Sequence, residues 1–145
     1  MTTEKLCKTI EHLIDAWGPI EGRTRLLKLV YLADQIWASQ DGAPYTEAKY
    51  YRWNHGPFSR EILKAIEWMD GIEIVETTQP WERGETYCYR SGSSTRLARV
   101  ELDASFVQIL DEIGERWRSR PLKELLDYVY GDEGFKQKEF GDYLF

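Results

Sequence analysis

The sequence predicts a mainly helical α+β protein, with about five helices around a buried central helix and a small antiparallel sheet. Three observations support this prediction. Apolar residues recur at intervals of three and four over several segments, which is the spacing of amphipathic helices. The segment 23–38 is apolar on nearly every side, as expected of a helix enclosed by its neighbours. Two runs rich in β-branched and aromatic residues, 72–78 and 86–90, indicate a hairpin.

Length and composition are those of a globular domain. The chain has 145 residues, of which 42% are hydrophobic and 30% charged, so we expect residues 1–145 to form a single domain. No apolar run reaches the roughly 18 residues that span a bilayer, and the N-terminus lacks the pattern of a signal peptide. We therefore expect a cytoplasmic protein with no membrane partner. The net charge of −6 disfavours non-specific binding of nucleic acid.

The first half of the chain is expected to begin with two helices. A threonine cap and an apolar stripe predict a helix over 3–17, which Gly18-Pro19 ends. The central helix follows at 23–38 and closes before the loop that carries Gly42 and Pro44. Tyrosine and tryptophan then favour a strand at 49–53, which we expect to join the hairpin in one sheet.

The second half is expected to return to helices after the hairpin. Pro57 suits the first turn of a third helix over 58–69. The hairpin tip, 79–85, is longer than a tight turn. Helical spacing predicts two further helices over 103–117 and 122–130, although Gly114 weakens the last turn of the first. The segment 131–145 forms either an ordered tail packed on the domain or a flexible segment that orders on a partner.

The junction from Trp53 to Phe58, WNHGPF, is the most unusual local sequence. Gly56 and Pro57 favour a sharp turn from strand to helix. The amides at such a helix start would attract an anion or a carboxylate, and His55 beside them could act as a pH-sensitive contact. Alternatively, the junction is a structural corner whose aromatic side chains fill the core.

Tyr31 and Asp34 lie one helical turn apart on the central helix, so their side chains can meet. A carboxylate in a mostly apolar helix needs partners if it is buried. Tyr31 and Asp34 either line a polar site, together with His55, or Asp34 bonds a backbone amide or an arginine in a structural network.

Basic residues gather in three groups, at 23–28, 90–99 and 116–120. If these groups converged, they would form a basic face for phosphate or for an acidic protein. Catalytic signatures such as a nucleophile elbow, a phosphate-binding loop or a zinc-protease motif are absent from the sequence. Two cysteines and two histidines do not complete a zinc spacing. We therefore expect no enzymatic activity, no metal and no cofactor.

The order helix, strand, helix and two-stranded wing is typical of winged-helix DNA-binding regulators. Those proteins join the two helices of the reading motif by a turn of roughly 3–4 residues, whereas a loop and a strand separate them here. DNA binding, with the hairpin as a wing, remains the alternative to protein binding.

Three segments resemble the Panacea, or SocA-like, domain family. KLVYLAD at 28–34 is similar to the family's KLLYLAD segment, and YYRWNHGPF at 50–58 is similar to its Y-x-x-W-x-Y-G-P-[FV] segment. GAPYT at 42–46 is similar to the G-x-P-[IL]-T link between them. Where the family often has tyrosine, this chain has His55.

The resemblance implies a protein-interaction domain without catalytic activity. Members of the family neutralise diverse toxins, one also delivers its toxin to a ClpXP-type protease, and others are known only as phage-associated proteins. We therefore expect an antitoxin or a proteolytic adaptor whose partner is a protein. The candidate partner-binding residues are Tyr31, Asp34, Tyr50, Trp53, His55, Phe58 and Arg60. Lys28, Gly56 and Pro57 are expected to maintain the structure of the motif.

Overall fold

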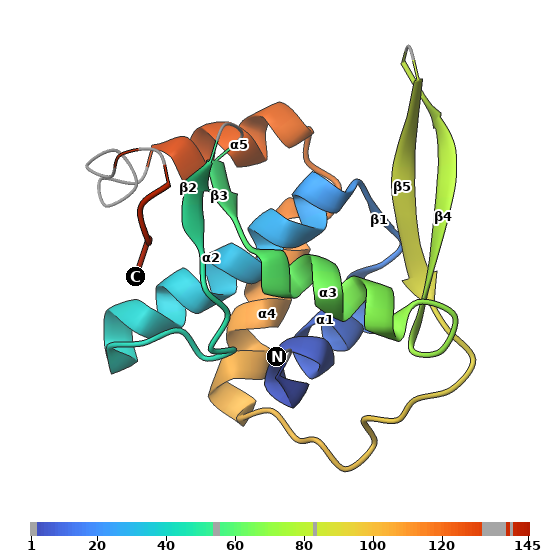
Figure 1. The fold of residues 1–145 in the computed structure, drawn as a ribbon, viewed down its shortest axis with the longest axis horizontal. Helices are drawn as coiled ribbons and strands as arrows, with labels where there is room; N and C mark the ends of the chain where they lie inside the picture. Colours follow the sequence, from blue (N-terminus) through green and yellow to red (C-terminus); the bar gives the residue numbers. More distant parts are fainter. Residues whose placement is uncertain (1–2, 54–55, 83, 132–138, 140) are drawn as a thin grey trace.

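A computed structural model describes residues 3–53, 56–82, 84–131, 139 and 141–145. These residues form five α-helices and two small antiparallel sheets, which confirms the predicted mainly helical α+β class (Figure 1). The helices are α1 (Glu4–Trp17), α2 (Arg23–Asp41), α3 (Arg60–Met69), α4 (Ala104–Trp117) and α5 (Leu122–Tyr130). The strands are β1 (Ile20–Glu21), β2 (Tyr51–Trp53), β3 (Gly56–Phe58), β4 (Ile74–Trp81) and β5 (Gly84–Ser91).

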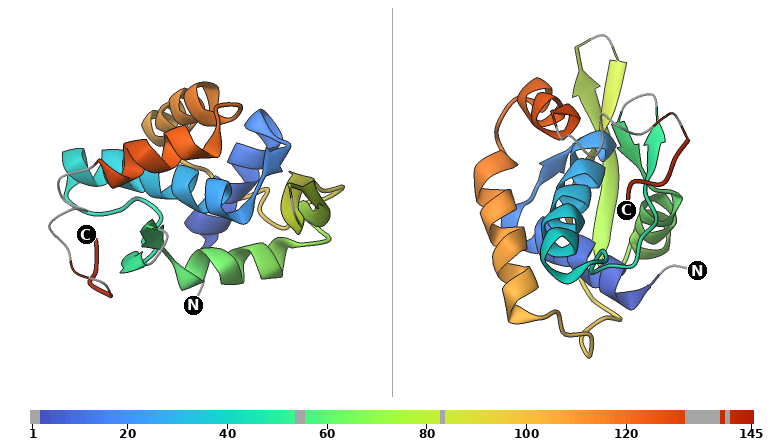
Figure 2. Two further views of the ribbon diagram at one scale, coloured as in Figure 1. Left: turned by 90° about the horizontal axis from the view of Figure 1, so that it is seen from above. Right: turned by 90° about the vertical axis from the view of Figure 1, so that its left-hand side faces the viewer.

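Helix α2 runs between two layers of the molecule. Helices α4 and α5 pack on one side of it, while α3 and the β2–β3 hairpin lie on the other (Figure 2). The segment Arg25–Asp34 is buried throughout, whereas residues 35–41 are half-buried or exposed. The burial that we expected for the whole of 23–38 therefore applies to 25–34.

Helices α1 and α4 approach each other closely at Gly114. A Cβ atom at this position would lie 2.4 Å from the Trp17 ring, so a larger residue could not pack in the same way. The helix continues past Gly114 to Trp117, although the glycine had weakened the prediction for this turn. Its role is close packing rather than helix termination.

Strands β4 and β5 form an arm that projects from the helical body (Figure 1). Their ladder runs from Ile74–Ser91 to Trp81–Gly84, so the strands extend well into the segment 79–85 that we predicted to be a loop. Pro80 lies in β4, which is an edge strand of its sheet. Proline, which has no N–H to donate, is tolerated in edge strands. The third strand of this sheet is β1, which pairs with β5.

The structure corrects the prediction that 49–53 joins the arm in one sheet. Strand β2 pairs instead with β3, so that Tyr51 faces Phe58 and Trp53 faces Gly56. Gly56 has a φ of +96°, which glycine adopts without the steric cost that other residues meet. Pro57 consequently lies in a strand, and α3 begins two residues later than predicted, at Arg60.

The described residues near the end of the chain pack along β2. Leu144 N donates to Tyr50 O at 3.0 Å, and Arg52 N donates to Asp142 O at 2.8 Å. The Phe145 ring lies 5.6 Å from the Tyr31 ring. Of our two alternatives for 131–145, the packed one applies to residues 141–145, whereas 132–138 and 140 lie outside the described residues.

Candidate partner-binding site

The amino group of Lys28 joins α2 to β3. Lys28 is 3% exposed, and its Nζ donates a hydrogen bond to the carbonyl oxygen of Pro57. Burial lowers the pKa of Lys28 from 10.5 to about 8, because the charged form loses hydration. In the part of the chain that the structure describes, no carboxylate oxygen lies within 4.0 Å of this amino group. The ammonium is therefore a buried positive charge with a single carbonyl partner there.

Gly56 allows the β2–β3 hairpin to reach Lys28. A Cβ atom at Gly56 would lie 2.8 Å from Tyr130 Cε1 and 3.3 Å from Lys28 Cε. The first distance is shorter than a van der Waals contact allows. The absence of a side chain, together with the positive φ, therefore places the Pro57 carbonyl where Lys28 can bond it.

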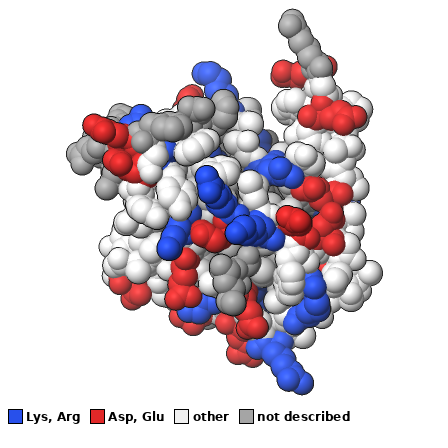
Figure 3. All heavy atoms as spheres, in the orientation of Figure 1, with Lys and Arg blue, Asp and Glu red and all other residues white. Residues whose placement is uncertain are grey.

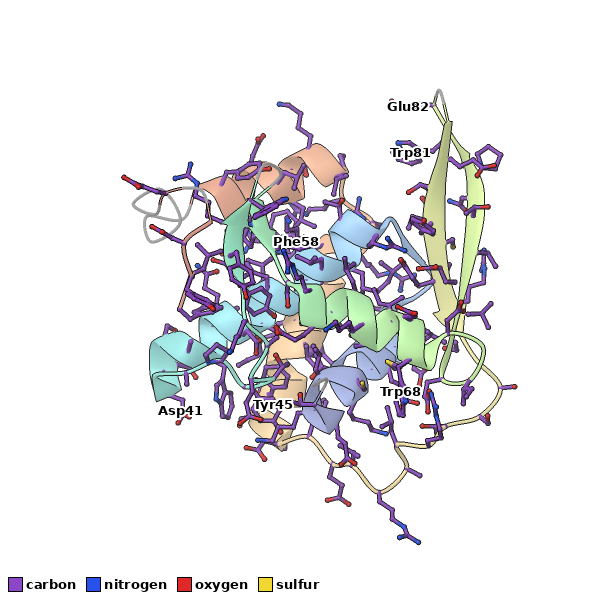
Figure 4. The ribbon with its side chains drawn as sticks, in the orientation of Figure 1. Asp41, Tyr45, Phe58, Trp68, Trp81 and Glu82 are labelled. Atoms are coloured by element: carbon purple, nitrogen blue, oxygen red, sulfur yellow. The ribbon has the colours of Figure 1, made fainter. Side chains whose placement is uncertain are left out.

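A groove of about 320 Å³ lies between α2 and the β2–β3 hairpin. Lys28 and Leu27 from α2 line it together with Trp53 and Phe58 from the hairpin. The Trp53 and Phe58 rings stack with their centroids 5.8 Å apart. Figure 4 shows Phe58 beside α2, where β3 leads into α3. The groove is thus apolar along its walls, with one buried amine among its lining residues.

A second hollow of about 260 Å³ shares two lining residues with the first. Both are lined by Arg23 and Thr24, in the first turn of α2, and the second extends to Trp81 on the arm. Arg23 is already paired, since its Nη2 lies 3.1 Å from Glu76 Oε2. Together, the linings of the two hollows include residues of the β2–β3 hairpin, the first turn of α2 and the arm.

A second polar network lies deeper, around the fully buried Asp34. Its carboxylate accepts a hydrogen bond from Thr46 N at 3.0 Å and one from the Tyr50 hydroxyl at 2.6 Å, as well as one from the Thr46 hydroxyl. Burial raises the pKa of Asp34, although these hydrogen bonds oppose the rise. The network fixes the loop after α2 to the middle of that helix.

The family model described as "Antitoxin SocA-like, Panacea domain" matches residues 26–134. The chain belongs to this family. No match was found among curated proteins or among solved structures.

In this Panacea domain, hydrogen bonds connect the first motif segment to the other two. Lys28 in the first segment bonds Pro57 in the last, and Asp34 bonds both Thr46 in the link and Tyr50. The two polar residues of an otherwise apolar helix segment thus fasten the other two segments to α2. This is the structural network that we considered for Asp34, with a backbone amide as one partner.

The predicted partner-binding residues differ in their solvent exposure. Tyr31, Asp34 and Tyr50 are each at most 2% exposed, and the Tyr31 and Tyr50 rings meet edge to face at 5.2 Å. Trp53 is 39% exposed, Phe58 is half-buried and Arg60 is exposed. His55 lies outside the described residues. The structure therefore brings Tyr31, Asp34 and Tyr50 together in the interior and places Trp53, Phe58 and Arg60 at the surface.

Several basic residues are engaged within the Panacea domain rather than free to form a basic face. Arg96 bonds the buried Glu73, with Nη2 2.8 Å from Oε1, and its guanidinium lies 3.6 Å from the centre of the Trp68 ring. Arg25 donates to the carbonyl oxygen of Trp117 at 2.9 Å. Basic and acidic side chains lie next to one another on the face shown in Figure 3.

Sequence reasoning missed the residues that complete the groove and the deeper network. Thr24, Leu27 and Leu63 line the groove, but they look like ordinary helix residues in the sequence. Thr46 was noted only as part of a motif, and its bond to Asp34 depends on a loop that no spacing rule describes. The polar positions of the central helix were the available signal, and they did identify Asp34.

Two further properties of the described residues concern membranes and metals. No helix among them is long and apolar enough to cross a membrane. Within the same residues, no group of three or more histidine, cysteine, aspartate or glutamate side chains is placed to hold a metal ion.

Proposed function

We propose that this protein is a non-enzymatic antitoxin that neutralises a toxin by binding it directly. The observation that carries the proposal is the family match over residues 26–134, a range that contains most of the groove between α2 and the β2–β3 hairpin. Binding would occlude a surface that the toxin needs for its activity. This mechanism requires an exposed recognition surface and no catalytic group.

We place that recognition surface on Trp53, Phe58 and Arg60. Exposed tryptophan and arginine side chains often supply most of the energy of a protein interface. Tyr31, Asp34 and Tyr50 would support the surface from the interior, since they are buried. Lys28, Gly56 and Pro57 would hold the hairpin in position through the contacts described above.

The proposal is tested by expressing the neighbouring open reading frame alone and together with this protein. The frame alone should arrest growth, co-expression should restore it, and the two proteins should purify as a complex. A harmless reading frame, or restored growth without a complex, would contradict the proposal.

A pair of tryptophan variants tests the position of the recognition surface. Trp53→Ala removes a ring at the groove, whereas Trp68→Ala removes one on α3 that is 46% exposed. We expect Trp53→Ala to weaken the complex by about 2 kcal/mol or more, as for a central interface residue, and Trp68→Ala to have little effect. If both variants lost the same affinity for the toxin while their thermal stability was unchanged, the recognition surface could not be the one proposed.

The same cells distinguish simple occlusion from delivery to a ClpXP-type protease. If the protein only occludes the toxin, the amount of toxin should stay constant after protein synthesis is stopped. If it acts as an adaptor, the toxin should disappear faster with this protein present, and only in cells that contain the protease.

DNA binding by a winged-helix arrangement has less support. In the sequence, residues 74–91 include three glutamates and two arginines, so this segment bears a net negative charge that opposes phosphate contacts. The order of elements also differs, because β2 and β3 lie between α2 and α3. A gel-shift titration with the protein's own promoter at low salt should show no complex.

A further inference from the structure

Lys28 brings a positive charge to the groove between α2 and the β2–β3 hairpin, and no described carboxylate pairs with it. Lys28 lines the groove beside Gly56 and Pro57. Its Cε lies close to Gly56, and its Nζ donates a hydrogen bond to the Pro57 carbonyl oxygen. An ammonium group has three N–H donors, and the Pro57 carbonyl uses one of them. The nearest described residues provide no carboxylate partner within ion-pair distance. The chemistry that complements this site is an anion that accepts hydrogen bonds.

The groove walls favour a carboxylate that is flanked by apolar groups. Trp53 and Phe58 form one wall with their stacked rings, and Leu27 contributes from α2. A single amine in such a setting matches one carboxylate better than a nucleic-acid backbone, which needs several cations along its length. The chain's net charge of −6 also opposes nucleic acid as the occupant.

The shape of the surface indicates a chain that passes through rather than one that ends in the groove. The hollow around Trp81 shares the lining residues Arg23 and Thr24 with the groove, so both hollows adjoin the first turn of α2. A segment whose C-terminal carboxylate bound Lys28 would extend from it in one direction only. An acidic side chain within an extended segment would use both hollows.

We propose that this groove binds an internal glutamate or aspartate of an extended segment of the partner protein. The carboxylate accepts hydrogen bonds from the Lys28 amino group, and neighbouring apolar side chains of the segment pack against Trp53 and Phe58. This inference rests on the proposed function, because the partner is the toxin that the protein neutralises.

A peptide library tests the groove without the toxin. Short amidated peptides carry glutamate between apolar residues, and each has a twin with glutamine in its place. Wild-type protein should bind a subset of the glutamate peptides about tenfold to a hundredfold more tightly than their twins, as for a buried charge-assisted contact. The proposal is overturned if no glutamate peptide exceeds its twin, or if only peptides with a free C-terminal carboxylate bind.

Two variants at Thr24 locate the contact while preserving the fold. Thr24 is half-buried in the first turn of α2, four residues before Lys28, where glutamate suits both the helix dipole and an ion pair with Lys28. Thr24→Glu should therefore place a carboxylate within the groove and abolish the preference for glutamate peptides. Thr24→Gln, of the same size and without charge, should keep that preference. Equal binding by both variants would overturn the proposal.

Lys28→Met provides the direct test, with Lys123→Met as its control because the Lys123 side chain is 89% exposed. The preference for glutamate over glutamine should vanish in the first variant and persist in the second. These results do not depend on growth arrest by a neighbouring gene. The antitoxin proposal can therefore fail while the groove still binds acidic peptides, and it can hold while the groove shows no such preference.

Discussion

Lys28 on α2 donates a hydrogen bond to the carbonyl oxygen of Pro57 on β3, and both residues are buried. The bond connects two segments that lie far apart in the sequence. It also places a desolvated amine against the backbone of β3. The β2–β3 hairpin is therefore attached to α2 at two buried points, through Lys28 and through the bond from Tyr50 to Asp34.

Replacing Gly56 by alanine should destabilise the protein more than replacing Gly42. Both glycines have positive φ angles, +96° and +92°, so both substitutions incur backbone strain of about 1 kcal/mol. At Gly56 the new methyl group also meets Tyr130 and Lys28, whereas nothing lies within 4 Å at Gly42. We expect the free energy of unfolding to fall by about 2–4 kcal/mol for Gly56→Ala and by about 1 kcal/mol for Gly42→Ala. Equal losses in urea titrations would show that the Tyr130 contact is unimportant.

Asp34→Ala should be among the most destabilising polar substitutions. It leaves the buried Thr46 amide and hydroxyl and the Tyr50 hydroxyl without their acceptor. Unmade buried hydrogen bonds cost about 1–3 kcal/mol each, and we expect a total loss of about 3 kcal/mol or more in thermal unfolding. Tyr50→Phe removes one donor and keeps the ring contact with Tyr31, so it should cost about 1 kcal/mol. A smaller effect of Asp34→Ala than of Tyr50→Phe would contradict this account.

The helices could be predicted from sequence because their apolar spacing is local. Each of the five segments carries a periodic stripe, and the predicted boundaries lie close to those of α1, α4 and α5. The pairing of strands could not be predicted in the same way. Residues 49–53 have strand-forming composition, but their partner β3 consists of Gly56, Pro57 and Phe58, two of which are residue types depleted in strands. Two residues at 20–21 form a strand only because β5 lies beside them.

The candidate site was predictable in part for a similar reason. A carboxylate in an apolar helix must find partners, so Asp34 was identifiable from sequence alone. Its actual partners come from a loop, and the groove is formed by hairpin and helix residues that approach only in three dimensions. Tyr50 was predicted as a candidate partner-binding residue, yet packing of Phe145 and Tyr31 around it leaves it buried.

Gly114→Ala should destabilise the protein, although alanine favours helices by about 1 kcal/mol. The added methyl group would lie 2.4 Å from the Trp17 ring, whose Nε1 is held 2.9 Å from Asp111 Oδ1. The ring must move and lose this hydrogen bond, so we expect a net loss of about 1–3 kcal/mol. In a Trp17→Leu background the same substitution should become neutral or stabilising. If Gly114→Ala stabilises the wild-type protein, the close contact between α1 and α4 is not a constraint.

The free energy of unfolding should rise with pH between the folded-state and unfolded-state pKa values of Lys28. Its pKa is about 8 in the folded state and 10.5 in the unfolded chain. Between these values the unfolded chain binds a proton that the folded protein has released, so raising the pH favours folding. Below pH 8 both states are protonated and the cost of burying the charge is fully present. Across the window, the free energy of unfolding of wild type should gain up to about 3 kcal/mol relative to Lys28→Met.

Comparison with Lys28→Met isolates this effect, because other lysines and tyrosines titrate in both proteins. Urea titrations at several pH values above 7 should give a difference that grows as Lys28 loses its proton. Lys123→Met, with an 89% exposed side chain, should show no such divergence from wild type. A constant difference between wild type and Lys28→Met would mean that the amine is hydrated in solution. The peptide that binds best to the groove should also shift the divergence to higher pH, since a carboxylate beside Lys28 stabilises the charged form.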